Sequence, residues 1–82
     1  MDTIKENHNV AEEIREVTTI IVMARMKAQK ALMTLKNNGS TEYESAIEEL
    51  DNIIEGCYEI ETNLGKTHLS VIVADTVCNV KL

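Results

Sequence analysis

The sequence predicts an all-α protein, an antiparallel hairpin of two long helices followed by a short third helix, which we expect to dimerise into a helical bundle. Two long stretches carry apolar residues at helical spacing, and a short polar segment with a glycine separates them. The composition is 44% hydrophobic but only 2% aromatic, without proline, so the expected core is aliphatic. The 82 residues are short enough to form one domain with a thin core.

The first helix is expected over residues 9–37, after a frayed segment, 1–8, that shows no periodicity. Asn9 followed by Glu12 has the spacing of an N-cap and a third helical residue that reaches back to it. Neither glycine nor proline interrupts the stretch. The predicted contact seam follows alternating steps of four and three residues: Val10, Ile14, Val17, Ile21, Ala24, Ala28, Ala31 and Leu35.

The middle of this helix is apolar on nearly every side, which exceeds what one partner helix covers. Ile20, Met23 and Met26 form the apolar belt that we assign to a second contact surface. Packing against another helix is favoured over a ligand groove. The sequence therefore predicts a homodimer, or a complex with another protein, with a four-helix arrangement.

A short turn and a second helix over residues 41–64 follow. Gly39 is the expected residue just past the first helix, and Ser40 or Thr41 is the expected cap of the second. The short connection predicts that the helices lie antiparallel. The second seam is expected at Ala46, Leu50, Ile53, Cys57, Ile60 and Leu64, widened by Tyr43, Ile47 and Ile54.

The segment 67–82 is expected to form a third helix, because Gly65-Lys66-Thr67 interrupts the pattern and Thr67 can serve as a cap. Its many β-branched residues also fit a strand. Since the chain offers no second strand, such a strand would have to pair with another molecule, and this alternative stays open.

The charge distribution predicts the kind of partner. Fourteen acids against eight bases give a net charge of −6, which argues against direct binding to nucleic acid or to an anionic membrane. Late bases of the first helix are expected to face early acids of the second. Four carboxylates recur at steps of four, three and four on one helix face: Glu44, Glu48, Asp51 and Glu55. A solvated surface explains such a line, and so does mimicry of nucleic-acid phosphates toward a basic protein.

No pattern in the sequence predicts catalysis, a cofactor or a metal. Cys-x-x-Cys, His-x-x-His and Glu-x-x-His spacings are missing, and the three glycines are isolated. Cys57 and Cys78 are expected to be buried thiols rather than a disulfide. The polar N-terminus and the lack of a long apolar run indicate a cytoplasmic protein without a membrane segment.

Two family resemblances concern the helical layout. Residues 12–14 and 28–32, with the polar turn and second helix after them, resemble the lactose/cellobiose-type phosphotransferase A component. That family's phosphoacceptor motif is Ala-His-x-x-Gln-Thr, and residues 57–62 here read CYEIET, with Tyr58 in place of the phosphorylated histidine. The resemblance therefore implies a helical component that does not carry phosphate.

The second resemblance is to the helical-hairpin partners of type VII secretion. Their turn carries Trp-x-Gly, and an aromatic-x-x-x-acid signal lies near their C-terminus. Asn37-Asn38-Gly39 and residues 71–75 (VIVAD) match the glycine and the acid but neither aromatic. This resemblance implies a secretion partner or chaperone as an alternative to our main expectation, a non-enzymatic inhibitor or adaptor that binds a basic protein.

Overall fold

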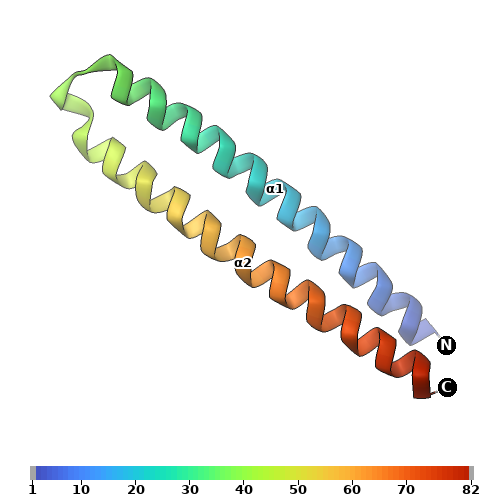
Figure 1. The fold of residues 1–82 in the computed structure, drawn as a ribbon. Coiled ribbons are helices and arrows are strands. Elements are labelled where there is room, and N and C mark those ends of the chain that lie inside the picture. Colours follow the sequence, from blue (N-terminus) through green and yellow to red (C-terminus); the bar gives the residue numbers. More distant parts are fainter. Residues whose placement is uncertain (1, 82) are drawn as a thin grey trace.

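The computed structural model describes the backbone of residues 2–81 and the side chains of residues 9–78. Two long helices, α1 (Asp2–Asn38) and α2 (Glu44–Lys81), are joined by a short 3-10 helix, η1 (Thr41–Tyr43). They lie side by side and antiparallel along their whole length, so the start of α1 and the end of α2 are at one end of a rod and the turn is at the other (Figure 1). The predicted all-α hairpin is confirmed.

The turn forms as the sequence predicts. Gly39 has a φ of 74°, in the left-handed region that favours glycine, and its N–H donates to the Lys36 carbonyl at 3.3 Å. The Ser40 hydroxyl then accepts a hydrogen bond from the Glu42 N–H at 3.2 Å, which caps η1. These two residues end α1 and start the return of the chain.

The predicted start of the first helix is wrong. The helix begins at Asp2, so Asn9 lies inside it and does not cap it. Residues 2–8 contain neither glycine nor proline, and extending an existing helix adds one hydrogen bond for each residue that becomes ordered.

The predicted third helix is also wrong, because α2 continues through Gly65 and Thr67 to Lys81 as one helix of 38 residues. The segment is helical and not a strand. Gly65 has a negative φ, and inward-facing residues have the same spacing before and after it. Glycine costs roughly 1 kcal/mol relative to alanine inside a helix, and this cost does not interrupt α2.

The inward-facing residues, here called the packing seam, differ from the predicted seam at every second position. On α1 the packing seam consists of Ala11, Ile14, Thr18, Ile21, Arg25, Ala28, Leu32 and Leu35. On α2 it consists of Ile47, Leu50, Ile54, Cys57, Glu61, Leu64, His68, Val71 and Asp75. Of these residues, Thr18, Arg25 and Glu61 are polar, and the apolar residue just before each of them was predicted instead. Ile47 and Ile54, predicted to widen the second seam, do face inward, whereas Tyr43 is exposed.

This hairpin has little core. Among the described residues only Ala11, Leu32 and Ile54 are buried, and no side chain is fully enclosed. The rod measures 63 × 14 × 13 Å with a radius of gyration of 18.5 Å, against about 12 Å for a compact chain of this length. Its accessible surface is 6290 Å², whereas a compact monomer of 9.2 kDa exposes roughly 4,900 Å².

Candidate functional site

A polar cluster occupies the middle of the packing seam. The Arg25 guanidinium donates two hydrogen bonds to the Glu61 carboxylate, Nε to Oε2 at 2.6 Å and Nη2 to Oε1 at 3.2 Å. Both side chains are mostly buried, at 16% and 18% exposure. The two-pronged geometry gives this contact a direction and a register as well as attraction.

Tyr58 and Gln29 complete the cluster on one side. Arg25 Cζ lies 4.4 Å from the centre of the Tyr58 ring, and its Nη1 donates to the Tyr58 hydroxyl and to Gln29 Oε1, both at 3.3 Å. Gln29 Nε2 donates to the Tyr58 hydroxyl at 3.2 Å. The hydrogen bond from Arg25 to Glu61 raises the pKa of Arg25 above its ordinary value, so this residue stays charged throughout the biological pH range. The cluster aligns the two helices, and sequence periodicity alone did not find it.

Among the residues that the structure describes, no three His, Cys, Asp or Glu side chains gather where they could hold a metal ion. Cys57 and Cys78 are both free; Cys57 is half-buried in the packing seam, while Cys78 is exposed, so the prediction of two buried thiols is wrong for Cys78.

The four predicted carboxylates all lie exposed on α2, toward the turn end of the rod. Glu48, Asp51 and Glu55 each directly follow a residue of the packing seam, which places them together on one side of the hairpin. We call Glu44, Glu48, Asp51 and Glu55 the acidic line.

The acidic line has no cationic partner among the described residues. The two ion pairs found there join Arg15 to Glu12 and Arg25 to Glu61. Arg25 thus pairs in the middle of α2 and not with its early acids, contrary to the expected complementarity of the two helix halves. The four carboxylates are therefore left for solvent or for another molecule.

The residues of the predicted apolar belt do not share one side of α1. Ile20, Met23 and Met26 are each more than half exposed. Ile20 directly precedes a packing-seam residue, and Met26 directly follows one, so helical geometry places them on opposite sides of the hairpin with Met23 on its outer surface. Their role in binding stays a prediction.

A second surface runs beside the packing seam on the side opposite the acidic line. It consists of residues at seven-residue steps, each just before a packing-seam residue: Val10, Val17, Ala24 and Ala31 on α1, and Ala46, Ile53, Ile60, Thr67 and Ala74 on α2. All these residues occupy the same position in the seven-residue repeat. In a pair of antiparallel helices, residues at this position of both helices lie on the same side of the pair. No member is charged, and we call this surface the uncharged face.

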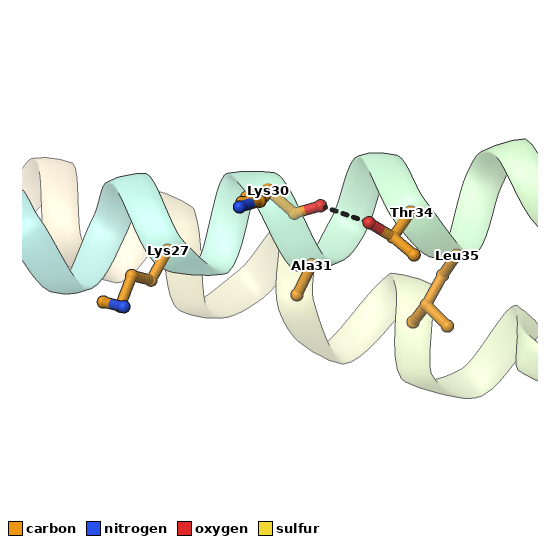
Figure 2. Close-up of a pocket in the computed structure, with 5 residues that line it drawn as sticks. All are labelled: Lys27, Lys30, Ala31, Thr34 and Leu35. Carbon is orange, nitrogen blue, oxygen red and sulfur yellow. Dashed lines mark hydrogen bonds between the residues drawn. The ribbon is translucent and has the colours of Figure 1, made fainter.

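The uncharged face is open to solvent. Its large members Val10, Val17, Ile53 and Ile60 are between 41% and 53% exposed. Beside Ala31, α1 has a shallow hollow of about 470 Å³, lined by Lys27, Lys30, Ala31, Thr34 and Leu35. Figure 2 shows these side chains along α1, with the Thr34 hydroxyl donating to the Lys30 carbonyl. Most of this face had been predicted as the packing seam, because its period is the same.

Comparisons with known proteins add no relative: no family model matches the chain, and no curated protein or solved structure matches it. Within the described part of the chain, neither helix has a stretch apolar enough to cross a membrane.

Proposed function

We propose that this protein is a non-enzymatic interaction module, an inhibitor or adaptor that binds a basic protein through the acidic line. The observation that supports this proposal is the set of four exposed carboxylates on one side of α2 without a cationic partner in the described residues. Unneutralised like charges on a rigid element speed encounter with a complementary surface and select against acidic partners.

The spacing supports a partial imitation of nucleic acid. Successive carboxylates of the acidic line are three or four residues apart, a rise of roughly 5 Å along the helix axis. One strand of DNA places a phosphate about every 3.4 Å. The line therefore offers a sparser row of negative charge, suited to a groove whose Lys and Arg side chains can adjust to it.

The test is a comparison of two neutralised variants as bait in an extract of the native host, followed by affinity measurement with each purified partner. One variant changes the acidic line (Glu44→Gln, Glu48→Gln, Asp51→Asn, Glu55→Gln). The matched control removes the same number of charges at other exposed acids: Glu16, Glu42, Glu49 and Glu59, each to Gln.

We expect a basic partner that binds the wild type and the control but not the acidic-line variant. Its affinity should fall steeply as salt rises above about 0.1 M, where the Debye length is roughly 10 Å. Duplex DNA should compete if the partner is a nucleic-acid-binding protein. A partner that binds all three proteins equally, at any salt concentration, would rule out this function for the acidic line.

A further inference from the structure

We infer that the uncharged face is covered by a second copy of this chain, turned end over end, to form a four-helix bundle with the two turns at opposite ends. This inference uses surfaces other than the acidic line and holds whether or not a basic partner exists. In the bundle α1 lies antiparallel on α1 of the second copy, and α2 on its α2.

The amount of surface that the hairpin leaves exposed favours a dimer. The hairpin shows roughly 1,400 Å² more surface than a compact monomer of its mass. A face 63 Å long and 14 Å wide has a projected area of roughly 900 Å², and a stable interface buries about 800 Å² on each partner. One copy of this face therefore matches what a dimer requires.

The distribution of large and small residues on the uncharged face also favours a second copy. At the open end of the hairpin the large residues, Val10 and Val17, are on α1, while α2 has Thr67 and Ala74. Toward the turn the order is reversed: α1 has Ala24 and Ala31, and α2 has Ile53 and Ile60. A ridge of large residues thus crosses the face diagonally, and a groove of small residues crosses it along the other diagonal.

In a second copy turned end over end, the ridge of large residues of each copy lies on the groove of small residues of the other. With the two-fold axis between Ile20 and Ile21, Val17 meets Ala24 of the second copy, and Val10 meets its Ala31, at the hollow beside Lys27. On α2 the same operation sets Ile60 against Thr67, and Ile53 against Ala74. Pairing large with small residues is how facing helices interdigitate without voids.

The charged residues beside the uncharged face select one arrangement of the two copies. Glu13 and Lys27 flank the uncharged face at nearly equal distances along the sequence on either side of the two-fold axis. The two-fold operation therefore brings Glu13 of each copy beside Lys27 of the other, giving two ion pairs at the rim. Placing α1 over α2 of the second copy instead would set Lys27 opposite Gly56 and Glu13 opposite Ser70, without opposite charges. Complementary charges thus select the end-over-end arrangement.

The oligomeric state of the purified chain tests the inference without any other protein. Light scattering at micromolar concentration should give twice the 9.2 kDa chain mass for the wild type. Ile20→Asp sets two carboxylates together at the axis and should weaken the dimer at least about 100-fold. Met26→Asp, at a similarly exposed site on the other side of α1, should leave it intact. A helical, monomeric wild type would overturn the inference, as would an Ile20→Asp dimer as tight as the wild type.

A charge exchange tests the arrangement even if Ile20→Asp fails to fold. Glu13→Lys and Lys27→Glu each create like charges at both rim sites and should weaken the dimer several-fold to about tenfold. The double variant restores opposite charges and should recover the wild-type affinity. If the single changes have no effect, or the double variant is as weak as the singles, the end-over-end arrangement is wrong.

Discussion

Arg25 and Glu61 form a two-pronged ion pair in the packing seam, at positions where a coiled coil ordinarily has apolar residues. The contact joins the middle of α1 to the middle of α2 and thereby sets which residues are level. If one helix were shifted along the other by one turn, Arg25 and Glu61 could no longer pair. We therefore assign to this pair the role of fixing how the two helices align along their length.

This assignment predicts how single and double changes compare. Arg25→Ala leaves the Glu61 carboxylate without its guanidinium and should lower the thermal unfolding midpoint clearly. Replacing both residues by Leu should cost less than the single change, or even stabilise the hairpin, because no charge is then left uncompensated. Thermal unfolding followed by circular dichroism, at one fixed protein concentration, makes the comparison. A double Leu variant less stable than Arg25→Ala would show that the pair supplies net stability.

Leu32 and Met33 allow a comparison of truncation at a buried and at an exposed position of α1. Leu32 is only 8% exposed in the packing seam, whereas its neighbour Met33 is 63% exposed. Leu32→Ala should lower the free energy of unfolding by about 2–3 kcal/mol, through lost burial and the cavity left behind. Met33→Ala should change it by less than about 0.5 kcal/mol. Urea unfolding at fixed protein concentration measures both values, and equal losses would mean that the seam is misplaced.

The glycines test the continuity of α2. Gly65 lies inside the helix with no atom within 4 Å of the place where a Cβ would be, so Gly65→Ala should stabilise the protein by about 0.5–1 kcal/mol. Gly39→Ala should have the opposite sign, a loss of about 1–2 kcal/mol, because the left-handed backbone at Gly39 strains any side chain. Loss of stability at Gly65 would indicate a break between helices there.

Asp75 offers a stabilising change. Its Oδ1 is buried and has no hydrogen-bond partner in the part of the chain that the structure describes. Asp75→Leu removes this desolvated oxygen from the packing seam and should raise the free energy of unfolding by about 1 kcal/mol. Thr76→Leu, at the exposed next position, is the control and should be close to neutral. A clear loss at Asp75 would mean that the carboxylate has a structural role.

The fold was predictable because the strongest signals are local. Two apolar periodicities and a glycine that ends the first helix are enough to predict an antiparallel hairpin, and Gly39 and Ser40 act as expected. Gly65 was misleading, since a propensity cost near 1 kcal/mol cannot break a helix that packs along its whole length. Apolar spacing alone also could not find the packing seam, because Arg25 and Glu61 belong to it and their neighbours Ala24 and Ile60 do not. The signal that would have identified the packing seam is the pair of opposite charges, Arg25 and Glu61. Each occupies the same position in the seven-residue repeat of its own helix.

Of the two candidate binding surfaces, the sequence predicts the acidic line but does not distinguish the uncharged face. The acidic line appears in the sequence as a charge pattern, and the structure shows that its members share one side of α2. The uncharged face was hidden within the predicted seam, since two surfaces with the same period overlap in a one-dimensional pattern. Separating them required knowing which positions the other helix covers.

The turn at Gly39 and Ser40 also sets an order of assembly. Contacts beside the turn close loops of a few residues, whereas contacts at the other end of the rod join residues separated by most of the chain. The entropy lost on closing a loop grows with its length. Contacts between the helices should therefore form first beside the turn and then progressively toward the termini. Backbone amides near the chain ends should then exchange with solvent deuterium fastest, and those beside Leu32 and Ile54 slowest.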